Sequence, residues 1–182
     1  MTQTMSPARH WLIAALLGLF VALLAWHWTV RATPGFLMDR AIDRVSGEKG
    51  MNAMGFAPLA TDEARAIVRP SPDLAYASCP FDVSKGPVLV EALPMPSPYW
   101  SVSVFDHRTD VAFVRNNRQS AGRPIRIAIV KPGVAAPAGY EPVPVSGARG
   151  IALIRALVPD RSQFGPLDQA RRLSGCRSVA TG

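Results

Sequence analysis

The side chains that could carry out chemistry are concentrated in one stretch of the chain, Arg69–Arg118. His107 lies there beside Asp106, and an imidazole next to a carboxylate can act as an acid–base group near neutral pH. His10 and His27 lie at or inside an apolar N-terminal run, so His107 is the histidine available to a folded domain. The alternative is that His107 is an exposed turn residue. The same stretch supplies three further polar candidates for a catalytic cluster: Asp73, Tyr76 and Asp82.

A charged pair is the second candidate site. Glu91 and Arg155 each interrupt an otherwise apolar strand face. A buried carboxylate–guanidinium pair would satisfy both charges, either as a structural pair or as a ligand-binding pair. The sequence has no glycine-rich phosphate loop, no nucleophile elbow, no paired-histidine zinc motif and no CxxC motif. We therefore predict no cofactor and no metal site.

The two cysteines, Cys79 and Cys176, lie far apart in the sequence. In an oxidising compartment a disulfide between them would stabilise the domain by roughly 4–5 kcal/mol, because it closes a long loop in the unfolded chain. The alternative is two unrelated thiols, since their spacing is not that of metal ligands.

The elements that must position these residues are mostly strands. Apolar residues alternate in Pro87–Leu93, Tyr99–Phe105 and Val111–Arg115, which is typical of strands with one buried face. Three prolines in Pro94–Pro98 predict a hairpin loop between the first two strands, because proline cannot donate to a sheet ladder. Later elements are strands and one short helix: Pro124–Val130, a short edge strand within 132–144, Arg149–Val158 and a helix over Pro166–Leu173. The 17 prolines in 182 residues suit a domain of strands and loops better than a helical bundle. We therefore predict a mainly β (α+β) fold of antiparallel strands with short flanking helices.

The N-terminus predicts a membrane anchor. After a short tail over 1–10, Trp11–Val30 is apolar except for His27, and as a helix it would span about 30 Å, the thickness of a hydrocarbon core. Tryptophans at both ends suit the membrane interfaces. A cleaved signal peptide is the alternative, with a site near Ala32. Thr33-Pro34 predicts the start of a second helix within a helix-and-linker segment over 31–60, and the β-rich domain, opening with a short helix at Thr61, occupies 61–178.

The location of the domain follows from charge and cysteine usage. Lysines and arginines are more frequent after the apolar run than before it, which would place the domain in the cytoplasm. This positive-inside rule is weak for a flank that is continuous with a long domain. The two cysteines favour export of the domain. We predict a single-pass protein of the bacterial inner membrane with its domain in the periplasm. From Arg115 onward there are 11 basic and 3 acidic residues, but an exported domain meets no nucleic acid, so none is predicted as a partner.

The stretch Arg69–Arg118 contains three spaced groups of residues: Pro70, Asp73 and Tyr76, then Asp82, Ser84, Gly86 and Pro87, then Tyr99, Trp100, Ser101 and Asp106. In these groups the stretch resembles the domain of unknown function 1254 family. Gly150–Arg155 and the helix after it resemble the closing strand and terminal helix, so the similarity covers roughly residues 60–175. The family has Asn and Thr where this chain has Ser71 and Leu74.

The resemblance implies a β-rich sandwich in the cell envelope with no established reaction. It also implies a partner, because this chain resembles the short, anchored branch whose companion C-terminal domain is encoded separately. Two functions are therefore expected. The first is a periplasm-facing binding or assembly module that works with that companion. The second is an envelope enzyme for a small or saccharide-like substrate, with Asp73, Tyr76, Asp82, Asp106 and His107 as its polar cluster.

Overall fold

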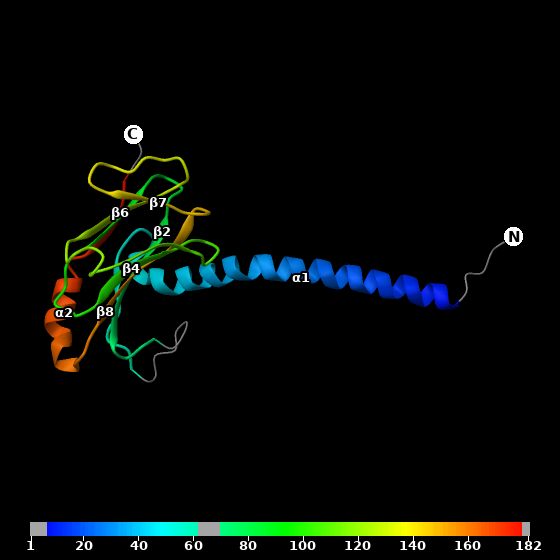
Figure 1. The fold of residues 1–182 in the computed structure, drawn as a ribbon, viewed down its shortest axis with the longest axis horizontal. Helices are drawn as coiled ribbons and strands as arrows, with labels where there is room; N and C mark the ends of the chain where they lie inside the picture. The colour runs from blue at the N-terminus through cyan, green and yellow to red at the C-terminus, as the bar shows by residue number, and fades with distance from the viewer. Residues whose placement is uncertain (1–6, 62–69, 180–182) are drawn as a thin grey trace.

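The protein consists of a two-sheet β-domain from which one long helix projects (Figure 1). The computed structural model describes residues 7–61 and 70–179. The predicted mainly β, sandwich-like fold with one N-terminal apolar helix is confirmed. The short helix expected at Thr61 lies outside the described residues.

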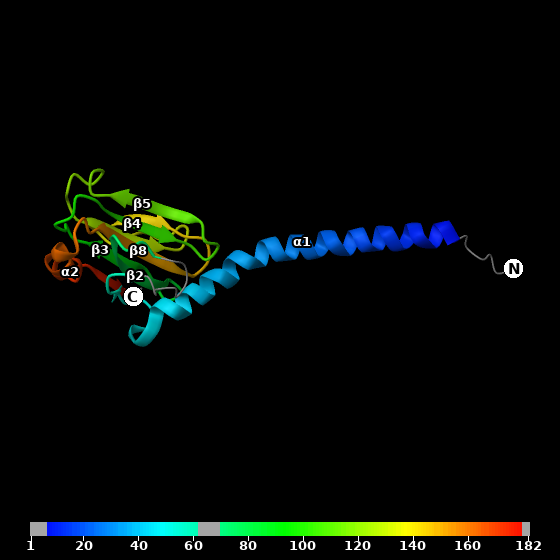
Figure 2. The same cartoon turned by 90° about the horizontal axis from the view of Figure 1, so that it is seen from below.

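The projecting helix, α1, is continuous from Pro7 to Ser46 and includes Pro34. The predicted second start at Thr33-Pro34 is therefore wrong. The Thr33 hydroxyl donates back to the carbonyl of Thr29 at 2.6 Å instead of capping a new helix. A proline inside a helix typically costs about 3 kcal/mol, because it removes a backbone hydrogen bond and crowds the preceding turn. Figure 2 shows the helix bending as it approaches the domain, as expected near a proline.

The last turns of α1 pack on the domain, whereas every residue from Pro7 to Thr33 is exposed. Met38 and Ile42 are buried against Ile151 and Phe105. The apolar stripe of these turns therefore packs under the domain. A short 3-10 turn, η1 (Gly47–Lys49), then leads into the sheets.

The first sheet, sheet A, has five antiparallel strands in the order β1-β2-β8-β4-β5. Their bounds are Gly55–Phe56, Leu74–Asp82, Arg149–Leu157, Trp100–Phe105 and Val111–Asn116. The predicted central strand near the C-terminus is β8, which lies between β2 and β4. Strand β2 is nine residues long, so its two ends are separated by about 25 Å.

The second sheet, sheet B, has the order β7-β6-β3-β9. Its strands are Glu141–Pro144, Ile125–Val130, Val88–Ala92 and Gly175–Ser178. The expected short edge strand is β7, but it runs parallel to β6, so sheet B is mixed. Strand β9 was not predicted. It follows the 3-10 turn η2 (Arg161–Gln163) and the terminal helix α2 (Phe164–Arg171).

The predicted hairpin across Pro94–Pro98 is wrong. Strand β3 pairs with β6 and β9, whereas β4 pairs with β5 and β8, so the loop crosses from sheet B to sheet A. Both strands bury an apolar face in the same core, and they meet face to face rather than edge to edge. Alternation identifies the buried face of a strand but not its neighbour.

The core lies between the sheets and is formed by alternate residues of both. Its largest members include Phe81, Trp100, Ile127 and Ile154, all at most 2% exposed. Cys79 of β2 is joined to Cys176 of β9 by a disulfide, with their Cα atoms 6.3 Å apart. The bridge therefore connects sheet A to sheet B across the core.

Candidate functional site

The five candidate catalytic residues do not form one cluster. Asp73 and Tyr76 lie at the start of β2, and Asp82 is its last residue. At about 3.3 Å per residue, Tyr76 and Asp82 are separated by about 20 Å. The single polar cluster that the enzyme hypothesis requires is therefore not present, and the candidates divide between opposite ends of sheet A.

Three candidates, Asp82, Asp106 and His107, lie at the end of sheet A where α1 docks. Asp82 accepts hydrogen bonds from the backbone N–H of Ser84, at 2.8 Å, and from its hydroxyl. Burial raises the pKa of Asp82, but the Ser84 hydrogen bonds and the positive charges of Arg149 and Lys131 outweigh it, so the pKa lies below its ordinary value. Asp82 is thus a stabilised carboxylate rather than a proton donor.

Asp106 organises the turn between β4 and β5. It is 4% exposed, and its Oδ1 accepts from the backbone N–H groups of Arg108 and Asp110 at 2.9 and 3.0 Å. Aspartate side chains commonly accept such bonds from the backbone a few residues further on in a turn. Asp106 also positions the next residue, His107.

His107 is held between the anchor helix and the domain. Its Nδ1 lies 3.8 Å from Oδ1 of Asp39 on α1, and the same oxygen lies 3.0 Å from Nη2 of Arg149. Two glycines allow the ring to sit here. A Cβ added to Gly35 would lie 2.8 Å from Nε2, and one added to Gly147 would lie 2.9 Å from the His107 Cβ. No local sequence pattern indicates Asp39 as a partner of His107, because only the docking of α1 brings the two together.

An open pocket of about 610 Å³ lies between α1 and the β4–β5 turn. Its lining includes Arg31, Gly35, Phe36, Asp39, His107 and Arg108. We name this the junction pocket. Asp39 is already paired with Arg149, so the excess charge of the lining is positive. The arrangement suits recognition of an anion more than nucleophilic catalysis, because no nucleophile lies beside His107 in the lining.

The predicted Glu91–Arg155 pair is wrong. Glu91 is in β3 of sheet B, where it lies opposite Arg126 of β6 and forms an ion pair with it on the outer face. Arg155 is in sheet A, where its neighbours across the strands are Tyr76 and Ser101. Its Nη2 donates weakly to the Ser103 hydroxyl at 3.5 Å. Sequence alternation correctly placed each residue on a strand face but could not assign the sheets.

A polar row crosses the outer face of sheet A at Arg155. Tyr76, Arg155 and Ser101 occupy adjacent positions on β2, β8 and β4. The Tyr76 hydroxyl accepts from the backbone N–H of Ser71 at 3.1 Å. Nε of Arg155 and Oγ of Ser101 are buried without a hydrogen-bond partner among the described residues. These three residues belong to the segments that match the family pattern, and they lie side by side on the sheet. They line neither the pocket between α1 and the β4–β5 turn nor the one beside β6.

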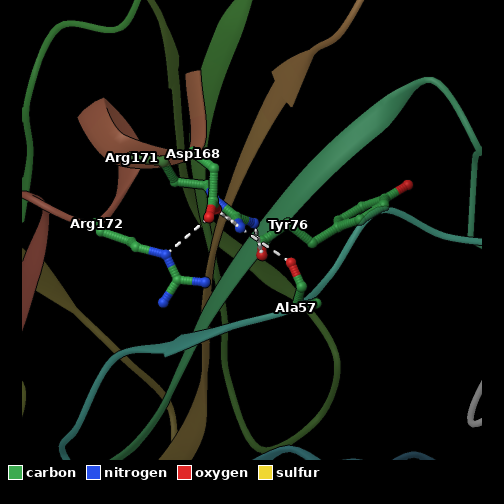
Figure 3. Close-up of polar contacts among 5 residues, drawn as sticks. All are labelled: Ala57, Tyr76, Asp168, Arg171 and Arg172. Atoms are coloured by element: carbon green, nitrogen blue, oxygen red, sulfur yellow. Dashed lines mark hydrogen bonds and ion pairs between the residues drawn. The ribbon is translucent and has the colours of Figure 1, made fainter. Parts of the chain in front are cut away.

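A third charged group is structural and was missed by the sequence reasoning. Arg171 of α2 is completely buried. Its guanidinium donates to the carboxylate of Asp168, to the backbone carbonyl of Tyr76 and, at 2.9 Å, to that of Ala57 (Figure 3). Arg172 binds the same Asp168 from the exposed side at 2.7 Å. In Figure 3 the Tyr76 ring points away from this group, so the contact is with backbone only and ties α2 to sheet A.

Among residues 7–61 and 70–179, no three His, Cys, Asp or Glu side chains lie close enough together to bind a metal ion.

Comparison with solved structures supports the fold. The chain is similar to the VPA0106 protein of Vibrio parahaemolyticus, with a TM-score of 0.57 and 14% identity over 80% of this chain and 37% of that one. It is also similar to an uncharacterised protein of Burkholderia cenocepacia, with a TM-score of 0.48 and 13% identity over 77% of this chain and 38% of that one. The chain thus spans less than two-fifths of the length of either protein. A search of curated proteins found no match.

Sequence comparison identifies the family. Residues 51–174 match the family described as "Protein of unknown function (DUF1254)". The match includes both ends of sheet A and the buried Arg171. The predicted resemblance is confirmed, and the chain belongs to the DUF1254 family.

Proposed function

We propose that this protein is a binding module of the bacterial cell envelope, anchored in the inner membrane by α1, with its domain in the periplasm and a separately encoded companion protein docked on it. The main support for the proposal is that α1 is one continuous helix with an exposed apolar part and a C-terminal part that packs on the domain. The helix therefore holds the domain by one end of sheet A.

The apolar part of α1 supports the anchor. Among the described residues, α1 is the one helix that is long and apolar enough to cross a membrane. The most apolar part of this helix is not buried in the protein at all. A core helix of a soluble protein would be covered on at least one face. The helix also continues through Ala32, the residue next to the alternative cleavage site, into turns that pack on the domain, which favours an uncleaved anchor.

The disulfide supports the periplasmic side. Cys79 and Cys176 are bonded in the structure, and disulfides persist in oxidising compartments such as the bacterial periplasm. The proposal of export rests on this bridge rather than on the flanking charges.

An unprotected sheet edge supports the partner. Of the four edge strands in the described part of the chain, β1 has two residues, β7 contains Pro142 and Pro144, and β9 has four residues and is held by the disulfide. Short strands and prolines protect edges from pairing with other chains. Strand β5 has six residues and no proline, and its Val111 and Val114 are 59% and 56% exposed. It is therefore suited to accept a further strand.

A second protein fits this edge better than a second copy. The Val111 end of β5 lies where α1 leaves the domain, so an antiparallel β5–β5 pair would send the two anchors out in opposite directions. One membrane cannot accept that arrangement. Arg115 of β5 is already paired with Glu141 of β7. The flanking Arg108, Arg118 and Arg123 form no ion pair in the described part of the chain, so we assign as occupant an extended segment of the companion with alternating apolar residues and acidic flanks.

A photo-crosslinking experiment tests the proposal. A photoreactive residue at position 114 should capture one envelope protein in intact cells, and that protein should align with the part of the VPA0106 protein that this chain does not cover. Val114→Lys should abolish its co-purification from solubilised membranes. Val134→Lys, at a valine 38% exposed in the β6–β7 loop, is the matched control and should have no effect. Equal recovery with Val114→Lys would exclude β5 as the docking edge, and a captured protein without that similarity would exclude the companion.

The enzyme alternative has less support. Its five candidate residues are divided between the two ends of sheet A, which are about 25 Å apart along β2. Asp82 and Asp106 are also engaged in turn hydrogen bonds. We therefore propose binding rather than catalysis.

A further inference from the structure

The junction pocket contains two arginines without acidic partners. Arg31 extends from α1 and Arg108 from the β4–β5 turn, and both line the pocket. Neither guanidinium forms an ion pair with an acidic residue in the described part of the chain. The carboxylate in the lining, Asp39, lies 3.0 Å from Arg149. The pocket therefore presents two uncompensated positive charges from two separate elements.

The position of the pocket along α1 places it at a membrane surface, if the anchor proposed above is correct. The run Trp11–Val30 spans about 30 Å as a helix, which matches the hydrocarbon core. Arg31 follows Val30. It lies three residues after Trp28, and the exposed rings of Trp26 and Trp28 suit the membrane interface. Asp39 lies eight residues later, about 12 Å further along the helix. The pocket thus begins in the headgroup layer and extends just above it.

The lining also has an apolar part. Phe36 is 59% exposed, lines the pocket and lies on α1 between Arg31 and Asp39. The ring can contact the glycerol or upper acyl region of a lipid while the two guanidinium groups bind phosphate oxygens. Arginine is well suited to this role because its planar donors match phosphate geometry.

We infer that the junction pocket binds the phosphate of an anionic phospholipid, clamped between Arg31 of the anchor and Arg108 of the domain. This inference rests on the proposed anchor and names a ligand for the site described above. Bound lipid would connect the β4–β5 turn to the membrane surface. The same chemistry would accept free inorganic phosphate, so the experiment must separate the two sources.

Native mass spectrometry of the full-length chain tests the inference. The protein is released from micelles containing equal amounts of phosphatidylglycerol and phosphatidylcholine, and the retained lipid is quantified. We expect wild type to retain phosphatidylglycerol preferentially. One arginine near an anionic surface contributes roughly fivefold, so Arg31→Gln with Arg108→Gln should reduce retention about thirtyfold. Arg44→Gln with Arg118→Gln removes the same charge, one arginine from α1 and one from the domain, outside the lining and should change retention less than the pocket variant.

Gly35→Leu tests the site without altering charge. Because a Cβ at this position would lie 2.8 Å from His107 Nε2, the leucine must occupy pocket space or displace the ring into it. Retention should fall while the disulfide and the circular dichroism spectrum stay native. Equal retention of the two lipids, or equal losses in both double variants, would overturn the inference. Displacement by inorganic phosphate, with phosphate itself bound through the same two arginines, would identify a free anion as the ligand.

These outcomes are separable from failure of the anchor. Micelle-bound protein can be assayed whether or not the chain is an integral membrane protein in cells. Extraction of the chain from membranes by alkaline carbonate would contradict the anchor, and selective lipid retention in that case would point to a surface-bound lipid-binding domain.

Discussion

Replacing Arg171 with methionine should strongly destabilise the domain. Arg171 is fully buried, and its guanidinium binds Asp168 and the carbonyls of Tyr76 and Ala57. Methionine fills much of the same volume but provides no donor. The substitution therefore leaves acceptors on α2, on β2 and next to β1 without this partner.

The expected loss of unfolding free energy follows from the groups that lose Arg171 as a hydrogen-bond partner. Removing one side of a buried ion pair typically costs about 3–5 kcal/mol, because the remaining charge and acceptors stay desolvated. Two features reduce the loss: Asp168 keeps Arg172, and the Tyr76 carbonyl keeps the N–H of Ala57 at 3.1 Å. With contacts to the rings of Phe56 and Phe164 also lost, we expect about 3–4 kcal/mol.

Urea unfolding of the full-length chain in micelles measures this effect. Trp100 is buried in the domain core, so its fluorescence reports unfolding once Trp11, Trp26 and Trp28 are replaced by phenylalanine. With a slope of about 1.5 kcal/mol per molar urea, the midpoint should fall by roughly 2 M or more. Arg172→Met is the matched control. It removes the exposed partner of the same Asp168 and should cost less than about 1 kcal/mol. Equal effects of the two variants would refute the view that burial of Arg171 holds α2 to sheet A.

Two further predictions concern the disulfide and acid stability. Reducing the bridge or replacing both Cys79 and Cys176 with serine should lower the free energy of unfolding by about 4–5 kcal/mol, because the bridge closes a loop of 97 residues; an unchanged urea midpoint in dithiothreitol would contradict this. Burial raises the pKa of Asp168, but hydrogen bonds from Arg172 and Arg171 and their charges outweigh it, so the pKa lies below its ordinary value of 3.8. The ionised Asp168 carboxylate therefore stabilises the folded state at pH values above 3.8. This stabilisation is lost as the pH falls below that value and the carboxylate becomes protonated. The urea midpoint should therefore decline below about pH 4, less steeply in Asp168→Asn; the same decline in the variant would exclude Asp168 as the cause.

Local patterns in the sequence predicted the elements that carry strong apolar alternation. Ile125, Ile127 and Ile129 identify β6, and the stripe containing Met38 and Ile42 identifies the docked face of α1. Both signals depend on residues close together in the chain. The turn role of Asp106 was predictable for the same reason, since its partners lie two and four residues away.

Features that depend on distant partners could not be predicted. The assignment of β3 to sheet B depends on β6 and β9, and the same register pairs Glu91 with Arg126 instead of Arg155. Strand β9 has the sequence Gly-Cys-Arg-Ser, which has no apolar alternation. A charged residue on a short helix is normally solvated, so the burial of Arg171 follows only from acceptors 95 and 114 residues away.

The proposed topology, in which α1 holds the domain on the periplasmic side of the membrane, can be tested in intact spheroplasts. The spheroplasts are treated with protease and the domain is then detected. We expect the domain to be degraded before lysis while an N-terminal fragment containing Trp11–Val30 stays in the membrane fraction. A domain that is protected until the cells are lysed, or a chain that is released into the soluble fraction, would contradict it.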